Sequence, residues 1–251
     1  MRWKCTCGYD GTDWFGWQSQ AGGNAVQDML EFRLGEIFKR PIRIHGSGRT
    51  DSGVHAYGQV FHFDGEWHHP VCKLLRALQT GLPASIQVTK VSRCSGDFHA
   101  RFSAVGKQYL YRLYQGMAPP DENRYSWNLG NRSLDVARMQ DAADRLLGTH
   151  DFSAFAASRR GDTAPNPVKT LSRLDVTQRG KRIRIVTEGS GYLYKMVRSL
   201  VGTLVQVGLG NLTPDRVQAI LDSKQRTELV STAPAHGLWL MKVFYSKLRE
   251  K

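Results

Sequence analysis

The sequence lacks the long apolar segments that mark membrane and secreted proteins. Within its 251 residues no run of about 18 or more apolar residues occurs, so it predicts no transmembrane helix. Its first ten residues contain no apolar core of a secretory signal peptide. We therefore expect a cytoplasmic protein that does not bind a membrane.

Recognisable metal and cofactor motifs are also missing. The four cysteines fit neither a disulfide framework nor the ligand spacing of a zinc site; they are Cys5, Cys7, Cys72 and Cys94. The sequence contains no phosphate-binding P-loop and no dinucleotide-binding glycine fingerprint. We expect no metal and no cofactor.

Acidic residues are scarce relative to basic ones. The chain has 35 Lys and Arg against 22 Asp and Glu, a formal net charge of +13. A protein this basic is expected to bind a polyanion. Nucleic acid is favoured over a membrane surface, because no basic amphipathic helix with an aromatic-rich apolar face is apparent. A general contribution of the charge to solubility is the alternative.

A glycine-rich segment runs from Gly46 to Ala56 and reads Gly-Ser-Gly-Arg-Thr-Asp-Ser-Gly-Val-His-Ala. Its three glycines predict a tight loop between two strands, whose backbone can approach a ligand closely. Asp51 is the carboxylate at its centre, with Arg49 before it and His55 after it. Because Asp is also a common turn former, the loop alone leaves a purely structural role open.

Hydrophobic periodicity predicts a mixed chain of helices and strands. Alternation predicts strands at 2–10, 42–45, 54–63, 86–92, 106–114, 170–178, 182–188 and 238–245. Apolar stripes predict helices from 24 to 38, at 70–79, at 135–147, from 194 and after 213. Asn24 is the expected cap of the first helix, with Gln27 in the capping-box position. Residues 118–133 are loop-like in composition.

The order of these elements predicts the fold class. The first half follows the order β, α, β, β, α, β of a split βαβ, or ferredoxin-like, unit. The second half again reads as a mixed αβ unit. We therefore predict an α+β fold of two ferredoxin-like halves with mostly antiparallel sheets. The predicted domains are residues 1–104, which carry the Asp51 loop, and residues 105–251.

Two further residues in the second half are candidates for a functional role. Tyr109 and Tyr111 share one face of a predicted strand, where tyrosine is first of all a β-former. Arg198 lies in an apolar segment, where a guanidinium is costly unless a carboxylate pairs with it. The residues themselves leave both structural and functional interpretations open.

Several of these segments resemble the tRNA pseudouridine synthase A (TruA) family. The resemblance rests on Tyr9 to Gly11, Phe15 to Gln18, Gly48 to His55, Phe98 to Phe102, Lys107 to Tyr111 and Met196 to Arg198. The segments occur in family order along nearly the whole chain. Tyr194 and Lys195 depart from the family pattern, which affects only contacts next to Arg198.

The resemblance implies an enzyme that isomerises uridine to pseudouridine in the anticodon stem-loop of tRNA, at positions 38 to 40. It implies that Asp51 is the catalytic residue, that Arg198 pairs with it and that Tyr109 contacts the target base. Arg49 and His55 are further substrate-binding candidates on the same loop. The resemblance also implies a cleft between the two halves, a homodimer, and no metal or cofactor.

Two functions from other classes remain as alternatives. A non-catalytic RNA-binding module with two ferredoxin-like halves would use the aromatic residues of 55–63 and the positive charge, but it would not need Asp51. A glycosidase-type hydrolase usually needs two cooperating carboxylates, and the sequence offers one convincing candidate. The polar, basic loop at 156–169 either reaches RNA or is simply solvated.

Overall fold

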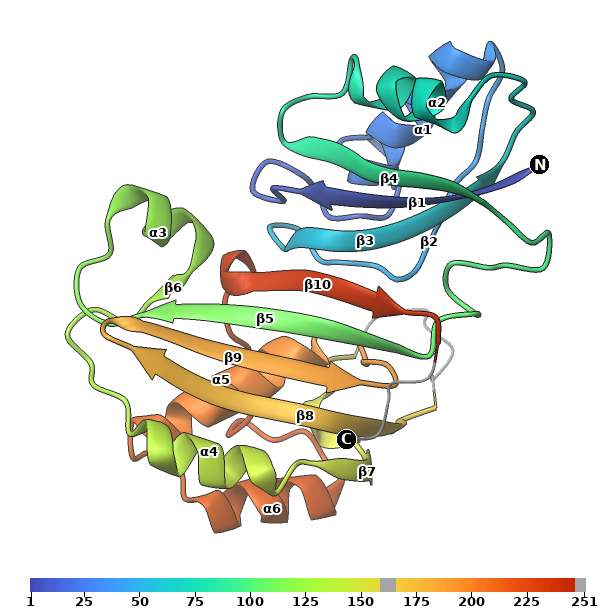
Figure 1. Cartoon of the computed structure of the whole chain (residues 1–251). Coiled ribbons are helices and arrows are strands. Elements are labelled where there is room, and N and C mark those ends of the chain that lie inside the picture. The colour runs from blue at the N-terminus through green and yellow to red at the C-terminus, as the bar shows by residue number, and fades with distance from the viewer. Residues whose placement is uncertain (159–165, 247–251) are drawn as a thin grey trace. The chain divides into compact units, whose positions relative to one another are not determined.

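The computed structural model describes residues 1–158 and 166–246, and half of the basic loop predicted at 156–169 lies outside these ranges (Figure 1). The fold is α+β with mostly antiparallel strands, which confirms the predicted class. The chain forms two compact units. Unit 1 comprises Met1–Val105 and the segment from Trp239 onward, and unit 2 comprises Gly106–Leu238. No helix in the described ranges is long and apolar enough to cross a membrane.

Unit 1 is a sheet with two helices on one of its sides (Figure 1). Its strands are β1 (Arg2–Tyr9), β2 (His45–Gly46), β3 (His55–Asp64), β4 (Ile86–Cys94) and β10 (Leu238–Phe244). Its helices are α1 (Val26–Phe38) and α2 (Val71–Gln79). The order across the sheet is β4-β1-β3-β10, and β2 pairs with β3.

The C-terminal strand joins unit 1, although the sequence placed it with the second domain. β10 pairs in parallel with β3, with Trp239 opposite His55 and Leu240 opposite Ala56. Strand pairing between residues so far apart leaves no local signal, because alternation predicts a strand without naming its neighbour.

The core of unit 1 follows from the alternation in β1. Trp3, Cys5 and Cys7 are fully buried, whereas the residues between them are half-buried. The buried side chains of β1 share a side of the sheet with Phe61 and Phe63 of β3, and α1 covers this side, where the Phe38 and Phe63 rings lie 5.6 Å apart. The opposite side of the sheet carries Lys4 and Thr6.

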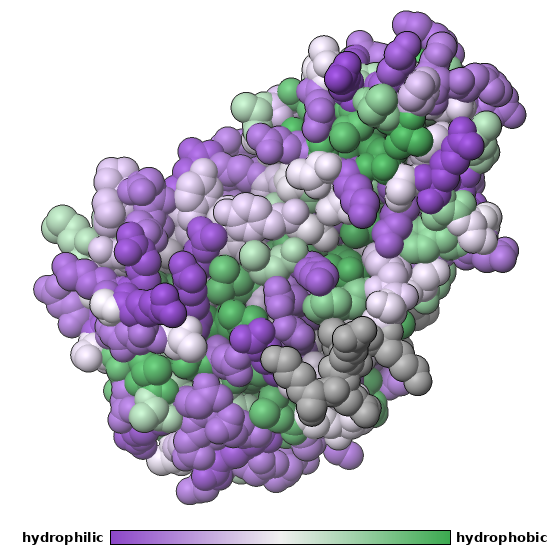
Figure 2. All heavy atoms as spheres, in the orientation of Figure 1, coloured by the Kyte–Doolittle hydropathy of each residue, from purple (hydrophilic) through white to green (hydrophobic). Residues whose placement is uncertain are grey.

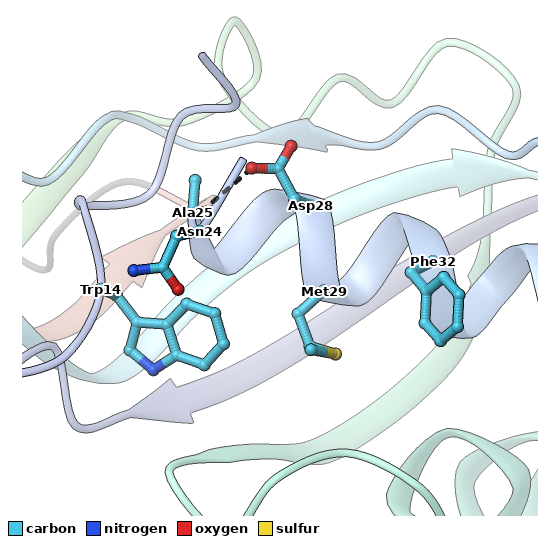
Figure 3. Close-up of a pocket in the computed structure, with 6 residues that line it drawn as sticks. All are labelled: Trp14, Asn24, Ala25, Asp28, Met29 and Phe32. Carbon is cyan, nitrogen blue, oxygen red and sulfur yellow. Dashed lines mark hydrogen bonds between the residues drawn. The ribbon is translucent and has the colours of Figure 1, made fainter. Parts of the chain in front are cut away.

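The predicted cap of α1 is wrong by one residue. The helix begins at Val26, with Ala25 as the N-cap, and the Asp28 carboxylate accepts the Ala25 amide at 3.0 Å (Figure 3). Asn24 has a left-handed backbone, with φ at 64°, and its side chain donates to the Asp13 carbonyl instead. Only the carboxylate half of a capping box therefore forms, one residue later than the sequence pattern indicates, because the Ala25 side chain cannot accept a hydrogen bond.

Unit 2 consists of mostly antiparallel strands with helices of its own. Its strands are β5 (Gly106–Tyr114), β6 (Trp127–Asn128), β7 (Gly148–Asp151), β8 (Val168–Arg179) and β9 (Arg182–Gly189). Its α-helices are α3 (Pro120–Tyr125), α4 (Val136–Asp144), α5 (Met196–Gly208) and α6 (Pro214–Ser223). The strand order is β5-β9-β8-β7, and β6 pairs with β5.

Helix α5 is the central helix of unit 2. Eleven of its residues are buried. Its apolar residues surround the helix axis, whereas a surface helix has them on one face only. The helix predicted after 213 is α6, and Thr213 caps it, since the Thr213 hydroxyl accepts the Arg216 amide at 3.2 Å. The loop predicted at 118–133 instead contains α3 and β6, whose lengths of six and two residues are too short for a periodic signal.

Candidate active site

Asp51 lies in unit 1 on residues 47–54, the loop that joins β2 to β3. Its side chain is half-buried, and its carbonyl accepts the Val54 amide at 3.1 Å, which closes a tight turn. The Ser52 hydroxyl donates to the Trp14 carbonyl at 3.2 Å. These bonds place the carboxylate on a short turn held by neighbouring backbone.

The start of this loop is anchored to β3 by buried polar groups. The Ser47 hydroxyl donates to Gln59 Oε1 at 2.6 Å, and Gln59 Nε2 donates to the Gly48 carbonyl at 2.9 Å. The Ser47 and Gln59 side chains are fully buried. The Tyr9 and Thr50 hydroxyls bond to each other at 2.8 Å. Buried polar groups that find partners in this way fix one conformation, since each unmade bond would be costly.

A second loop, at residues 11–18, packs against the first. The Trp17 amide donates to the Thr50 carbonyl at 3.1 Å. Gly16 has φ at +83°, and a Cβ there would lie 2.5 Å from that same carbonyl. A glycine at position 46 leaves room for the Trp17 indole, so part of the predicted glycine pattern accommodates the protein's own side chain rather than a ligand.

Arg49 and His55 occupy different environments on either side of Asp51. Arg49 is exposed, and its Nε donates to Gln18 Oε1 at 3.3 Å. His55 is fully buried. Its Nδ1 accepts the Gly11 amide at 3.0 Å, and Asp10 Oδ1 lies 3.1 Å from the same nitrogen. A neutral ring satisfies the amide, whereas a protonated ring pairs with the carboxylate.

Three aromatic rings stack at the start of β3. The indole of Trp239 lies between His55, at 4.3 Å between ring centroids, and Tyr57, at 4.6 Å. The interplanar angles of 21° and 17° are those of stacked rings. No sequence pattern indicated this stack, because Trp239 lies on the distant strand β10. The stack ties the end of the Asp51 loop to the C-terminal strand.

Tyr109 lies in unit 2 on β5, and only 8% of its surface is exposed. Its ring meets the Tyr192 ring edge to face, with 5.1 Å between centroids and 85° between planes. The Tyr192 and Thr187 hydroxyls bond to each other at 3.0 Å, and burial raises the pKa of Tyr192 well above its usual range. The Tyr109 ring is therefore held at a defined angle by a buried aromatic partner.

Arg198 is the third residue of α5 and lies in the same unit as Tyr109. It is half-buried, between fully or nearly fully buried apolar neighbours, as its sequence context predicts. Its Nε donates to the Ala233 carbonyl at 2.8 Å, and the Ala233 amide donates to the Arg198 carbonyl at 3.0 Å. These two reciprocal bonds fix the direction of the guanidinium. Burial raises the pKa of nearby Tyr111, and the positive charge of Arg198 opposes that rise.

Arg226 supports the segment that holds Arg198, and no sequence pattern indicated it. Its guanidinium donates to Ser199 Oγ on α5 at 2.9 Å, to the Val230 carbonyl at 3.1 Å and to Thr232 Oγ1 at 2.9 Å. It thereby ties residues 230–232 to the first turn of α5. Arg226 lies outside any periodic sequence pattern, so only the folded structure reveals its contacts with α5 and residues 230–232.

A group of three histidines, His45, His62 and His99, occurs in unit 1. The His62 ring lies 5.0 Å from the His45 ring and 4.7 Å from the His99 ring. Burial, and then the nearby His99 and His45, lower the pKa of His62 to about 4. His62 Nδ1 accepts the Ala100 amide at 3.1 Å. Within 1–158 and 166–246, no three His, Cys, Asp or Glu side chains are grouped so that they could hold a metal ion.

A shallow hollow of about 260 Å³ lies beside the loop at 11–18 (Figure 3). It is lined by Trp14, Asn24, Ala25, Asp28, Met29 and Phe32. None of the residues predicted for the active site lines it. The Trp14 backbone nevertheless connects its edge to the Asp51 loop through Ser52.

Comparison with known proteins relates both units to one family. The family model described as tRNA pseudouridine synthase matches residues 7–103 and 142–246. The chain belongs to the tRNA pseudouridine synthase family. The two matched segments contain the Asp51 loop and Arg198, whereas Tyr109 lies between them.

Relatives that match over nearly their whole length are named tRNA pseudouridine synthase A. The relative from Exiguobacterium sibiricum is 40% identical over 252 residues, covering 99% of this chain and 98% of its own. The relative from Bacillus subtilis is 43% identical over 248 residues, covering 98% and 99%. That from Paramagnetospirillum magneticum is 44% identical over 248 residues, covering 98% and 95%. Family membership thus extends over nearly the whole chain.

Proposed function

We propose that this protein isomerises uridine to pseudouridine in the anticodon stem-loop of tRNA, at positions 38 to 40. The observation that carries the proposal is the match to synthases of the same length over nearly the whole chain. The net charge of +13 supports a polyanionic substrate. The reaction breaks the N1–C1′ bond, turns the base and joins C5 to C1′. The proton lost from C5 is balanced by one gained at N1, so no net oxidation occurs.

Asp51 is the proposed catalytic residue, acting at C1′ or on the 2′ proton. The surroundings of its loop support this role, because backbone and buried side-chain bonds hold the turn before any substrate arrives. A preorganised group loses little freedom when the substrate binds, which is a large part of enzymatic rate enhancement. In this proposal Arg198 pairs with Asp51 and keeps it ionised, as the family resemblance implies.

The remaining site residues are assigned to handling the base. The target uridine must leave its stack, at a cost of a few kcal/mol. Exposed Arg49 is suited to clamp a phosphate or occupy the vacated space during that step. Tyr109 is assigned to contact the base, with its ring held by Tyr192. Because His55 is fully buried, we assign it to positioning the loop through Gly11 and Trp239 rather than to contacting RNA.

The partner in solution is tRNA, and the family resemblance favours a homodimer and a cytoplasmic location as further parts of the proposal. The runner-up is a non-catalytic RNA-binding module. Half-exposed Tyr57, on β3, is the observation that favours it. Such a module would bind tRNA without altering it.

Release of tritium from uridine C5 tests the proposed function directly. Unmodified tRNAs would carry labelled uridine only at positions 38 to 40, or only elsewhere, and binding would be followed in parallel by gel shift. Release from the first set alone is the expected result. Release from the second set alone would contradict the proposed positions. Binding without release from either set would replace the enzyme with the RNA-binding module.

A further inference from the structure

The helix-free side of the unit 1 sheet contains a groove of about 340 Å³, here called the sheet-face groove. It is lined by Lys4 and Thr6 of β1, Tyr57, Gly58 and Val60 of β3, Lys90 and Ser92 of β4, Met241, Lys242 and Val243 of β10, and Tyr245. Its lining therefore comes from the four strands β4, β1, β3 and β10, with α1 and α2 on the other side of the sheet (Figure 1). None of the residues proposed for the active site belongs to it.

The charged side chains that line the sheet-face groove are all positive. Lys4, Lys90 and Lys242 come from three different strands, and no carboxylate is among the lining residues. In the described part of the chain, none of these three ammonium groups forms an ion pair; Lys4 lies instead over the Tyr245 ring at 3.8 Å. Burial and the neighbouring charge of Lys90 lower the pKa of Lys4. Unpaired like charges gathered in one place raise the energy of the free protein and are relieved by a bound anion.

A β-bulge in β4 supports a functional role for Lys90. The register of β4 with β1 shifts between Thr6, opposite Lys90, and Cys7, opposite Val88, so Thr89 is an extra residue. The Thr89 hydroxyl bonds to the Thr6 carbonyl at 3.3 Å. Bulges locally bend a strand and re-aim its side chains, and they are frequent beside binding sites. Here the bulge adjoins a lysine that lines the groove.

The floor and rim of the groove also suit a polynucleotide strand. Gly58 has no side chain to fill the floor, where β3 approaches the Met241 carbonyl closely. The Thr6 and Ser92 hydroxyls add uncharged hydrogen-bonding groups. The Tyr57 ring is 51% exposed at the rim and is kept rigid by stacking on Trp239. Figure 2 shows that hydrophilic side chains dominate the visible face of the molecule.

We propose that the sheet-face groove binds the sugar–phosphate backbone of the RNA substrate, with phosphates at Lys4, Lys90 and Lys242. This inference rests on the proposed function and deepens it, because it adds a contact surface apart from the Asp51 loop. The groove would contribute affinity and orientation without taking part in the chemistry. A variant of the groove should therefore raise KM and leave kcat unchanged, as expected for uniform binding of substrate and transition state.

The test uses the double variant Lys90→Gln with Lys242→Gln, in the full chain with unmodified tRNA. Affinity would be measured from about 50 to 200 mM salt, together with kcat and KM. Each lost phosphate contact lowers the slope of log affinity against log salt by roughly 0.7 to 0.9. The expected result is a slope smaller by about 1.4 to 1.8 and an affinity lower by roughly tenfold.

Two matched variants make the result specific to the groove. Lys73→Gln with Arg76→Gln removes the same charge from exposed positions of α2, on the other side of the sheet, and should leave the slope nearly unchanged. Lys90→Arg with Lys242→Arg keeps both charges and should restore binding. Equal losses in the groove and α2 variants would overturn the proposal in favour of bulk charge.

A second copy of the chain is the competing occupant, and sedimentation tests it. A groove variant that changes the sedimenting mass, with an unchanged salt slope, would overturn the proposal and make the groove a protein interface. Failure of the proposed function would be recognised separately, because the wild-type protein would then form no pseudouridine. The dependence of tRNA affinity on salt would still show whether the groove binds RNA.

Discussion

Asp51 in unit 1 and Arg198 in unit 2 are held by different kinds of structure. Asp51 lies on a turn whose shape depends on hydrogen bonds to a second loop and to β3. Arg198 lies on a helix that is buried along most of its length, and two bonds to Ala233 direct its side chain. A residue on a loop is sensitive to any change in the neighbouring loop, whereas a residue on a packed helix is sensitive mainly to changes in its own bonds.

The largest expected effect comes from Asp51→Asn in unit 1. Removing the proposed catalytic charge should lower kcat by at least about 10³-fold, while tRNA affinity changes little. Single-turnover tritium release and a gel shift measure the two quantities separately. Retention of more than a tenth of the wild-type kcat would remove Asp51 from the chemistry.

Arg198→Lys in unit 2 is expected to have the next largest effect, lowering kcat by about 10²-fold, because a lysine keeps the charge but loses the directed Nε bond to Ala233. Arg145→Lys is the control, since its contacts to Asp141 and Asp215 are surface ion pairs and should leave kcat unchanged. If Arg198 acts through Asp51, the double variant with Asp51→Asn should be no slower than Asp51→Asn alone. If instead the fold-losses in kcat of the two single variants multiply in the double variant, the two residues act independently.

Gly16→Ala tests whether the second loop determines the shape of the Asp51 turn. The added Cβ would lie 2.5 Å from the Thr50 carbonyl, at a residue with φ of +83°. We expect a loss of about 1 to 3 kcal/mol in the free energy of unfolding, together with a lower kcat. Gly96→Ala is the matched control, because a Cβ there meets nothing within 4 Å. Equal effects of the two substitutions would show that the loop contact is unimportant.

The stability of unit 1 should depend on pH through His62. Because its pKa is lowered to about 4 in the folded chain, the unfolded chain binds the proton more readily. The stability contributed by neutral His62 is thus present above pH 6.5 and is lost as the pH falls toward 4. Between pH 7 and pH 5 this loss is roughly 2 kcal/mol.

Urea unfolding followed by tryptophan fluorescence measures this loss, since five of the six tryptophans belong to unit 1. In His62→Asn the side-chain oxygen can still accept the Ala100 amide, so the variant should keep its fold and lose about 2 kcal/mol less on acidification. The same pH dependence in wild type and variant would exclude His62 as the cause.

The smallest effects compare two tyrosines on β5 in unit 2. Tyr109→Phe preserves the ring that meets Tyr192 and should lower kcat by roughly tenfold, through the loss of its hydroxyl beside the base. Tyr111→Phe removes a 2.7 Å bond to the Pro234 carbonyl and should cost about 1 to 2 kcal/mol of stability with kcat unchanged. A loss of kcat in Tyr111→Phe, together with a loss of stability alone in Tyr109→Phe, would exchange the roles of the two residues.

Local sequence patterns predicted the elements of both units more reliably than their partners. The alternation in β1 and β5 and the stripe in α1 marked these elements within one or two residues, because side-chain periodicity is a property of the local backbone. The short elements α3 and β6 were missed, since two to six residues carry too little periodicity. The cap of α1 was misplaced by one residue, because Asn24 bonds to a neighbouring loop instead.

The candidate site shows the same division. The family resemblance singled out Asp51, Arg198 and Tyr109, with Arg49 beside Asp51. Glycine spacing and an arginine in an apolar segment, which are visible without a structure, drew attention to Asp51 and Arg198 but left their roles open. Ser47 with Gln59, the stacking of His55 on Trp239, and Arg226 could not be anticipated. Each of these contacts joins residues that are distant in sequence or lie outside any periodic pattern.

By itself, the sequence determined the α+β class, the family and the basic character of this protein, because composition, periodicity and short motifs are local properties of the chain. Only the tertiary structure decided that β10 joins unit 1, that His55 is buried and that lysines of three strands line one groove. The physical reason is that pairing and burial depend on long-range packing, in which one strand can satisfy its hydrogen bonds and its apolar face with many partners. The fold selects the partner that completes the sheet, and the sequence reveals that choice only once the chain is folded.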